Sequence, residues 1–179
     1  MKLIVFLIAN ILIMNTSYSQ HKTFHDFSAK TIDGKEMEMS SLKGKKVLVV
    51  NTASKCGLTS QYEELEELYK TYGGENFIIV GFPANNFLSQ EPGTDDEIKE
   101  FCQVNYGVTF QMMSKISVKG KDINPIYKWL TTKEENGVKD SKVSWNFQKY
   151  MIDENGQLVD FVSPKESPMS DKIVNWIKG

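Results

Sequence analysis

The pattern that most restricts the fold is a pair of apolar runs separated by one amphipathic helix. Residues 47–50 read VLVV and residues 76–83 read NFIIVGFP, as expected of strands covered on both faces. Between them, apolar side chains recur at helical spacing: Tyr62, Leu65, Leu68, Tyr69 and Tyr72. Ser60 and Glu63 predict a capping box at the start of this helix, and the glycine pair at 73–74 predicts its end. Strand, helix and strand in this order predict a right-handed βαβ unit with parallel strands.

Antiparallel strands are predicted on either side of this unit. Residues 27–39 alternate about an Asp-Gly turn at 33–34, and residues 145–162 alternate about an Asn-Gly turn at 155–156. Turns of this composition between short alternating runs predict β-hairpins. One more short strand is predicted within KISVKG, residues 115–120.

Three further helices are predicted, each from a residue that commonly begins a helix: Thr94, Pro125 and Ser170. The first is expected to run to about Gln103, with Glu97 completing a capping box, and the second through Leu130. The third has an apolar side formed by Ile173, Val174 and Ile177. The polar stretch at 131–142 is predicted to be a surface loop.

The order of these elements predicts an α/β protein with a thioredoxin-like fold: a mixed central sheet flanked by helices, with an N-terminal β-hairpin. We find no repeat, low-complexity tract or linker within residues 20–179, so a single domain is expected there. In open sheets of this kind, ligands gather beyond the carboxyl ends of the parallel strands. Two segments reach that edge: the turn that holds Cys56 and the loop that holds Gln90.

The first 19 residues differ from the rest of the chain. A basic start at Lys2 precedes an apolar run, and Ser17 and Ser19 give the small-x-small pattern of a cleavage site. We therefore expect residues 1–19 to be a secretory signal peptide. The mature protein would be exported, periplasmic or otherwise extracytoplasmic, with no stable membrane span after cleavage. An uncleaved anchor or a buried strand is the alternative, although a membrane span needs about 20 apolar residues.

The charged residues argue against two classes of function. The net charge of -2 gives no basic surface for nucleic acid. All 21 basic residues are lysines, so the chain lacks arginine, the usual bidentate clamp for carboxylates and phosphates. The only histidines, His21 and His25, lie near the N-terminus, and no local Cys/His spacing predicts a metal site or another cofactor.

Cys56 has the position most suited to reactivity. A free thiol has a pKa of about 8.5, and only the thiolate is nucleophilic. Cys56 lies just before a predicted helix, where unpaired N–H groups and the helix dipole favour an anion, and Lys55 supplies a positive charge nearby. From position alone, three interpretations stay open: a reactive thiolate, a small buried hydrophobe, and half of a structural disulfide with Cys102.

Four blocks of sequence narrow this choice. The chain contains NTASKCGLTSQYEELEELY, GFPANNFLSQEPG, YGVTF and VSWNFQKY, in that order. Together they resemble the glutathione peroxidase family, in its version with cysteine rather than selenocysteine, and the likeness runs from about residue 24 to the C-terminus. It implies a peroxidase with Cys56 as the peroxidatic residue and Gln90, Trp145 and Asn146 completing the catalytic set. Their amide and indole N–H groups are neutral donors that suit a thiolate and a departing oxyanion.

The resemblance also gives Cys102 a role. It lies in EIKEFCQVNYGVTF, at the position of the resolving cysteine in the thioredoxin-dependent branch of the family. This implies that hydrogen peroxide or an organic or lipid hydroperoxide oxidises Cys56, that Cys102 forms a disulfide with it, and that a thioredoxin-like dithiol reduces the disulfide. From the residues alone, apolar packing beside Ile98 and Phe101 is the alternative. The two cysteines are 46 residues apart and lie on different predicted elements, whereas a disulfide needs Cα atoms within about 7 Å. We expect them to be too far apart in the reduced fold, so the helix at 95–103 must partly unwind.

Several departures from the family pattern bear on the site. Ala84 stands where many relatives have cysteine, so a third thiol is absent there. Gln111 stands where proline often follows VTF. The sequence NNFLSQ replaces the commoner NQFGGQ, which changes Asn86, Leu88 and Ser89. No long insertion of the type linked to tetramers precedes KISV, which predicts a monomer.

Four other functions stay open on the sequence. Glutathione as direct reductant would need its carboxylates bound by lysines, because arginine is absent. A thiol–disulfide oxidoreductase normally needs Cys-x-x-Cys, whereas residues 56–59 read Cys-Gly-Leu-Thr. A metal-binding module would need ligand spacing that the chain lacks. A peroxide sensor that passes its disulfide to a partner would use the same two cysteines.

Overall fold

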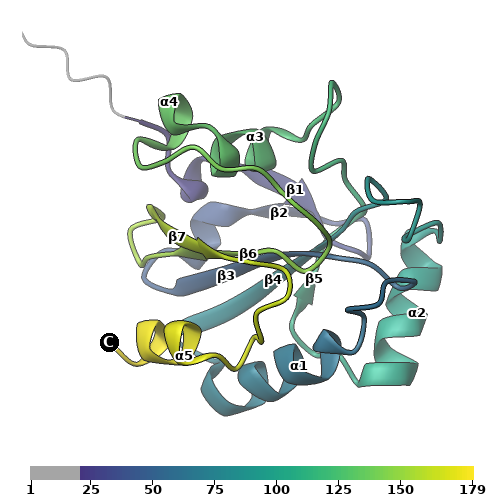
Figure 1. Ribbon diagram of the computed structural model, residues 1–179. Coiled ribbons are helices and arrows are strands. Elements are labelled where there is room, and N and C mark those ends of the chain that lie inside the picture. The colour runs from purple at the N-terminus through teal and green to yellow at the C-terminus, as the bar shows by residue number, and fades with distance from the viewer. Residues whose placement is uncertain (1–20) are drawn as a thin grey trace, which may run out of the picture.

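The computed structural model of the protein describes residues 21–179. The described chain forms a central sheet with helices on both faces (Figure 1). The predicted signal peptide, residues 1–19, lies outside the described residues and stays a prediction. Within the described part, no helix is long and apolar enough to cross a membrane.

The central sheet has five strands in the order β5-β4-β3-β6-β7. These strands are β3 (Lys46–Thr52), β4 (Phe77–Pro83), β5 (Gln111–Met112), β6 (Lys149–Ile152) and β7 (Leu158–Val162). The pairs β3–β4 and β4–β5 are parallel, whereas β3–β6 and β6–β7 are antiparallel. Helix α1 (Gln61–Tyr72) connects β3 to β4. The predicted βαβ unit, second hairpin and mixed thioredoxin-like sheet are therefore confirmed.

Strand β3 lies at the centre of the sheet and is covered on both faces. Val47 and Val49 belong to the hydrophobic core on one face, and Leu48 and Val50 to the core on the other. All four side chains are fully buried. The continuous apolar run in the sequence has this cause, because alternate side chains of a strand point to opposite layers and both layers here are apolar.

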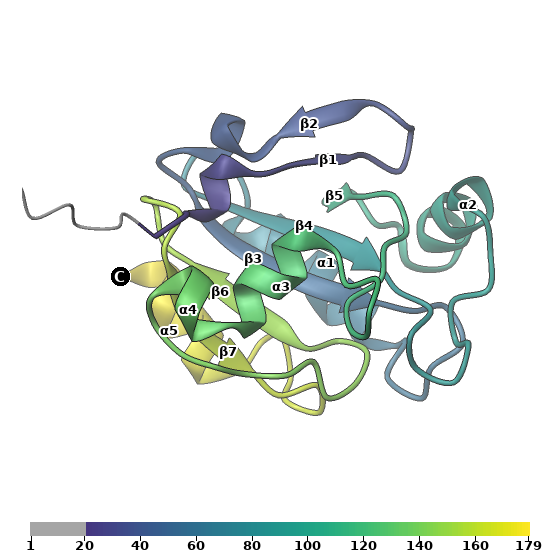
Figure 2. The same ribbon diagram turned by 90° about the horizontal axis from the view of Figure 1, so that it is seen from above.

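The helices divide between the two faces of the sheet. α1, α2 (Asp95–Tyr106) and α5 (Asp171–Lys178) contribute side chains to one hydrophobic core. α3 (Pro125–Thr131) covers the other face, next to the short helix α4 (Lys133–Asn136). Figures 1 and 2 show these two layers with the sheet between them.

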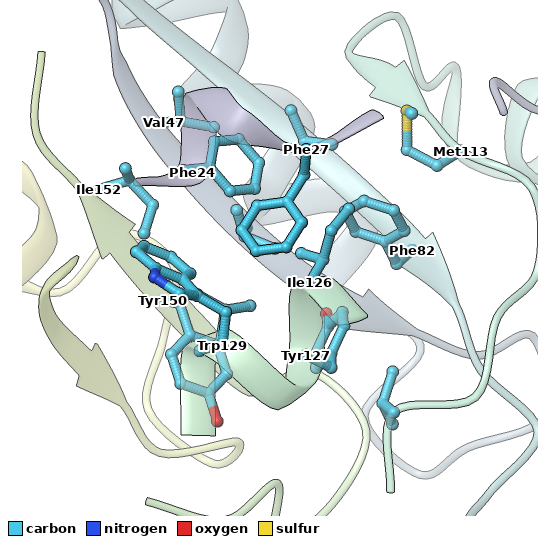
Figure 3. Close-up of a cluster of buried hydrophobic side chains, with 14 of the residues drawn as sticks. Phe24, Phe27, Val47, Phe82, Met113, Ile126, Tyr127, Trp129, Tyr150 and Ile152 are labelled. Atoms are coloured by element: carbon cyan, nitrogen blue, oxygen red, sulfur yellow. The ribbon is translucent and has the colours of Figure 1, made fainter. Parts of the chain in front are cut away.

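The core on the α3 side is rich in aromatic rings (Figure 3). Trp129 is fully buried, and its ring centroid lies 6.4 Å from that of Phe24 and 5.9 Å from that of Phe27. Its indole N–H donates a hydrogen bond to the carbonyl of Lys22 at 2.7 Å. The chain is therefore anchored to α3 from Lys22 onward, just after the predicted cleavage point.

The predicted N-terminal hairpin is confirmed as β1 (Ser28–Lys30) paired with β2 (Glu36–Glu38). Gly34 in its turn has a φ of +76°, which glycine adopts without a Cβ clash. The chain leaving β1 approaches β5, where the Ile32 N–H donates to the Met112 carbonyl at 3.0 Å. This contact covers the outer edge of the central sheet, which would otherwise expose unpaired backbone groups.

Three of the predicted elements differ from the structure. Residues 115–120 form no strand, because Ile116 and Val118 alternate for packing on the α3-side core, and the strand of this region, β5, lies earlier in the chain. The predicted loop at 131–142 contains α4. Helix α2 has the predicted capping box but continues to Tyr106, because Gly107 is the first residue to adopt the left-handed conformation that ends it. Ser170 stands at the start of α5 as predicted, although its side chain makes no capping bond.

One charged side chain is completely buried in the sheet. Lys149, in β6, is 0% exposed. Its ammonium group donates to Gln61 Oε1 at 2.6 Å and to the carbonyls of Pro164 and Glu166 at 3.2 and 2.5 Å. These bonds join α1 to the segment that follows β7. Burial lowers the pKa of Lys149 to about 8, and the charges of Glu64 and Glu166 act in the opposite direction.

We expect Lys149 to make the protein more stable as the pH rises from about 8 to 10.5. In this window the unfolded chain keeps the lysine proton up to its ordinary pKa of 10.5, whereas the folded chain has released it. Because the unfolded state then binds more protons, the free energy of unfolding increases with pH. Lys149→Met should remove this increase, which amounts to about 3 kcal/mol across the window.

Urea unfolding from neutral to alkaline pH measures the effect as the difference between the variant and the wild type. Lys142→Met, at an exposed lysine in the loop before β6, is the matched control and should keep the wild-type slope. The same pH slope in Lys149→Met as in the wild type would contradict the prediction.

Candidate active site

Cys56 lies in a series of turns between β3 and α1, and its side chain is half-buried. Its backbone N–H donates to the Thr59 hydroxyl at 2.9 Å, and that hydroxyl donates to the carbonyl of Ala53 at 2.9 Å. The Leu58 N–H points at the sulfur, 3.4 Å from Sγ. Thr59 therefore holds the turn in shape, and Leu58 directs a backbone donor at the sulfur.

The N–H groups at the start of α1 are not used as the sequence predicts. Ser60 already has helical dihedrals, and its side chain makes no capping bond. The first N–H groups of the helix donate to the carbonyls of residues 58–60. The predicted capping box is therefore wrong, because the preceding turns continue the hydrogen bonding of the helix. The donor directed at Cys56 comes from Leu58 inside the turn, not from the helix itself.

The loop after β4 brings Gln90 to the Cys56 turn, as predicted. The Ala84 N–H donates to the carbonyl of Thr52 at 3.0 Å, and the Lys55 N–H donates to the carbonyl of Gln90 at 2.9 Å. The segments that follow the two parallel strands are thus hydrogen-bonded to each other. This is the edge of the sheet at which ligands gather in such folds.

Asn146 brings a third segment to the same place. It is fully buried, and its Nδ2 donates to Gln90 Oε1 at 3.0 Å. Because the oxygen of the Gln90 amide accepts this bond, the amide N–H groups of Gln90 stay available as donors. The structure therefore joins two of the predicted site residues directly, although Gln90 and Asn146 are far apart in the sequence.

The loop that carries Trp145 and Asn146 is held by a residue that sequence reasoning missed. Asn51, buried at the end of β3, donates from Nδ2 to the Trp145 carbonyl at 3.1 Å. The Phe147 N–H donates to the Asn51 carbonyl at 2.6 Å. Phe147 has a φ of +66°, which is rare for a residue other than glycine. The only sequence signal for Asn51 was a polar residue at the end of an apolar strand.

An apolar groove lies next to the Cys56 turn. It has a volume of about 540 Å³ and is lined by Leu58, Ser144, Trp145, Ser163, Pro164 and Lys165. Leu58, whose N–H points at the Cys56 sulfur, forms part of the wall of this groove. The Trp145 ring packs on Phe87 with ring centroids 5.2 Å apart. A groove of this composition suits the apolar part of a small ligand.

Cys102 lies apart from these residues. It is buried on α2, next to Ile98, and both cysteines are free thiols. Burial raises the pKa of Cys102 to about 11, an effect that the neighbouring Tyr62 hydroxyl opposes. In this state Cys102 is a packed, protonated thiol, as expected from the apolar side of its helix.

The donor directed at the Cys56 sulfur is the uncharged Leu58 N–H. The Gln90 amide belongs to the loop that is hydrogen-bonded to the Cys56 turn, and Trp145 lines the groove that Leu58 also lines. Within residues 21–179, no group of three or more His, Cys, Asp or Glu side chains could hold a metal ion. The arrangement can stabilise negative charge on sulfur or oxygen by hydrogen bonding, and it leaves the thiolate free to react.

Comparison with known proteins identifies the family. A sequence model described as glutathione peroxidase matches residues 24–131. The glutathione peroxidase of Lactococcus lactis subsp. cremoris is 50% identical over 145 residues, which cover 81% of this chain and 92% of that protein. The chain belongs to the glutathione peroxidase family.

Other members of the family agree in sequence and in fold. Glutathione peroxidase-like peroxiredoxin 2 of Saccharomyces cerevisiae is 47% identical over 148 residues, which cover 83% of this chain and 91% of that protein. The crystal structure of Trgpx in its apo form superposes with a TM-score of 0.67 and 37% identity, covering 88% of this chain and 97% of that one. The protein is accordingly a thiol peroxidase, an oxidoreductase that reduces peroxides.

The glutathione peroxidase pattern explains the strain in the Gln90 loop. Leu88 and Ser89 each have a φ of +52°, in the left-handed region. They occupy the two positions where NQFGGQ, the commoner family sequence, has glycines. Glycine adopts this conformation freely, whereas other residues are strained by the contact of Cβ with the backbone. This chain therefore holds the Gln90 loop in a backbone conformation that suits glycine, with two residues that are strained in it.

We expect Leu88→Gly to stabilise the protein by about 0.5–1 kcal/mol. Relieving the left-handed strain gains about 1–2 kcal/mol, and the extra chain entropy of glycine removes about 0.5–1 kcal/mol of that gain. Leu88 is 79% exposed, so little packing is lost. Val104→Gly, at a position that is 75% exposed within α2, is the control and should lose stability. Urea unfolding measures the free energy of unfolding of both variants. A Leu88→Gly protein no more stable than the wild type would refute the strain argument.

Proposed function

We propose that Cys56 reduces the peroxide and that Cys102 resolves the product, in a two-cysteine cycle driven by a thioredoxin-like dithiol. The observation that carries the proposal is the setting of Cys56. Its thiol is half-exposed, faces the Leu58 N–H, and sits in a turn bonded to the Gln90 loop. Together with family membership, this setting supports Cys56 as the peroxidatic residue.

In the first half-reaction, the Cys56 thiolate attacks the distal oxygen of the peroxide. A sulfur–oxygen bond forms while the oxygen–oxygen bond breaks, and the hydroxide or alkoxide that departs takes up a proton to leave as water or alcohol. The free N–H groups of Gln90 and the Trp145 indole are the proposed donors to the departing oxygen, and Asn146 orients Gln90. Cys56 then carries a sulfenic acid.

The groove beside Trp145 supports organic hydroperoxides as substrates in addition to hydrogen peroxide. Its walls include the apolar side chains of Leu58 and Pro164, with Lys165 at its edge. A hydrocarbon group placed there would bring its hydroperoxide to the Cys56 turn. Hydrogen peroxide would need none of these contacts.

In the second half-reaction, the Cys102 thiol condenses with the Cys56 sulfenic acid, which forms the disulfide and releases water. Helix α2 must open for this step, because Cys102 is buried in it. Ile98 and Cys102 are the two fully buried residues of α2, so local unwinding there would release Cys102 and leave the other helices of that core in place. A dithiol then reduces the disulfide by thiol–disulfide exchange. The peroxiredoxin in the name of the Saccharomyces cerevisiae relative supports this route.

The setting of the enzyme is proposed from the sequence alone. Residues 1–19 support export, in which case the reductant would be an exported dithiol protein. The lack of a tetramer-type insertion before residue 115 supports a monomer.

Two cysteine variants test the cycle. Cys56→Ser should reduce peroxide consumption to background with any reductant, because the nucleophile is gone. Cys102→Ser should still react once with peroxide but lose turnover with thioredoxin, because no disulfide can form. Peroxide consumption is measured with thioredoxin or glutathione as the sole reductant.

Peptide mapping of peroxide-treated wild-type protein should show a Cys56–Cys102 linkage. If the linkage is absent, the two-cysteine cycle is wrong. Turnover by Cys102→Ser with glutathione at the wild-type rate would instead favour a glutathione-dependent peroxidase.

We expect Gln90→Ala to slow the reaction of Cys56 with peroxide by about 100-fold, because it removes the donors proposed for the departing oxygen. The second-order rate of sulfenic acid formation, followed in the Cys102→Ser background, measures this directly. Gln157→Ala, in the turn between β6 and β7, is the control and should react at the wild-type rate. A Gln90→Ala protein that reacts as fast as the wild type would remove Gln90 from the catalytic set.

A further inference from the structure

Glu91, the residue after Gln90, has no role in the cycle described so far. It is 0% exposed, and within the described residues neither of its carboxylate oxygens makes a hydrogen bond. Its backbone is well held, because its N–H donates to Asn85 Oδ1 at 2.9 Å and its carbonyl accepts from Lys115 Nζ at 3.3 Å. A carboxyl group buried without partners costs free energy, so its presence calls for an explanation.

Glu91 lies between the segments that carry the two cysteines. It lines a cavity of about 380 Å³ whose other walls include Ser54 and Lys55, from the Cys56 turn, and Ile98 and Phe101, from the helix of Cys102. On the Cys56 side, the Lys55 N–H bond to the Gln90 carbonyl holds its loop in place. When α2 opens, Glu91 would therefore stay with Cys56 and lose the wall formed by Ile98 and Phe101.

Other buried polar atoms surround Glu91 and lead to Cys102. The hydroxyls of Thr52, Ser54 and Tyr62 also make no hydrogen bond within the described residues. The Tyr62 hydroxyl lies beside the Cys102 thiol and the Thr52 hydroxyl, and Ser54 lies beside the Glu91 carboxyl group, in contacts looser than hydrogen bonds. Thr52, Ser54, Tyr62 and Glu91 thus contribute a cluster of buried polar atoms, in which Ser54 belongs to the Cys56 turn and Tyr62 neighbours Cys102.

The surroundings of Glu91 shift its pKa in both directions. Burial raises the pKa of Glu91, while Ser54, Lys115 and Lys55 lower it. A charge on Glu91 would raise the pKa of both Cys102 and Tyr62. Glu97, at the rim of the cavity, is the remaining acidic residue among those that line it. In the closed fold, burial thus raises the pKa of the Glu91 carboxyl group and of the Cys102 thiol.

Formation of the disulfide requires a proton to move. The Cys102 thiol must lose its proton as its sulfur bonds to the Cys56 sulfur, and the hydroxide that leaves Cys56 must gain one to become water. Even after α2 opens, a thiol in water has a pKa of about 8.5, so the Cys102 thiol is mostly protonated at neutral pH. The step therefore gains from a base near Cys102 that can pass the proton on.

We propose that Glu91 is the general base of disulfide formation, an inference that rests on the two-cysteine cycle. Opening of α2 admits water beside Glu91, which removes the burial that raises its pKa and so favours the carboxylate. The carboxylate accepts the proton of the Cys102 thiol as the S–S bond forms and the S–O bond of the sulfenic acid breaks. It then returns that proton to the departing hydroxide, so the products are a disulfide and water, and Glu91 is regenerated.

Glu91→Gln keeps the shape of the side chain and removes the base. Sulfenic acid formation should stay within about twofold of the wild-type rate, while the disulfide should form about 100-fold more slowly at neutral pH. Rapid-quench mass spectrometry, with a sulfenic-acid trap, resolves the two steps in one experiment. Glu97→Gln is the matched control, because glutamine preserves the α2 capping box, and it should leave both rates unchanged.

The pH profile of the wild type gives a second test that does not depend on a variant folding. With Glu91 as base, the rate of disulfide formation should level off once Glu91 is ionised. Without a base, it should rise steadily toward the pKa of Cys102. A steady rise in the wild type, or a Glu91→Gln protein that forms the disulfide at the wild-type rate, overturns the inference for Glu91 alone. Absence of any disulfide in the wild type overturns the two-cysteine cycle and this inference with it.

Discussion

The site depends on the backbone hydrogen bonds made at the C-terminal end of β3. The Thr52 carbonyl binds the loop after β4, and Asn51 binds the loop before β6 through its side chain and its carbonyl. The Cys56 turn follows directly. Because β3 is the central strand and is buried on both faces, its end cannot shift without disturbing both hydrophobic cores. The thiol, the glutamine and the asparagine therefore occupy fixed relative positions, although they come from three separate segments.

Strain and unpartnered polar groups gather around this point. The residues with left-handed backbone include Leu88 and Ser89, just before Gln90, and Phe147, just after Asn146. The side-chain oxygens of Glu91 and Tyr62 are buried without hydrogen-bond partners in the described structure. Such features reduce stability and persist only where the surrounding packing is strong enough to hold them. Those that lie beside the proposed site residues fit a region built for chemistry.

The two cysteines occupy opposite environments, and the difference fits the order of events in the proposed cycle. Cys56 is half-exposed in a tight turn with a backbone donor at its sulfur. Cys102 is buried in α2, and burial raises its pKa to about 11, so it stays protonated and inert in the closed fold. Along α2, only Ile98 and Cys102 are fully buried, and both belong to the core on that face of the sheet. The second thiol would then become available once the first has reacted.

Local patterns in the sequence determined the βαβ unit, the two hairpins, the α2 capping box and the family, because periodicity and turn residues act over a few neighbouring positions. The tertiary structure alone decided the position of β5 and the buried hydrogen bonds of Lys149. It also decided that backbone carbonyls, not the Ser60 side chain, accept the first N–H groups of α1. It further decided that Asn51 holds the Trp145 loop and that the Glu91 side chain is buried without hydrogen-bond partners among the described residues. Most of these features depend on residues that are distant in the sequence, and a local sequence pattern does not predict which distant residues come into contact in the fold.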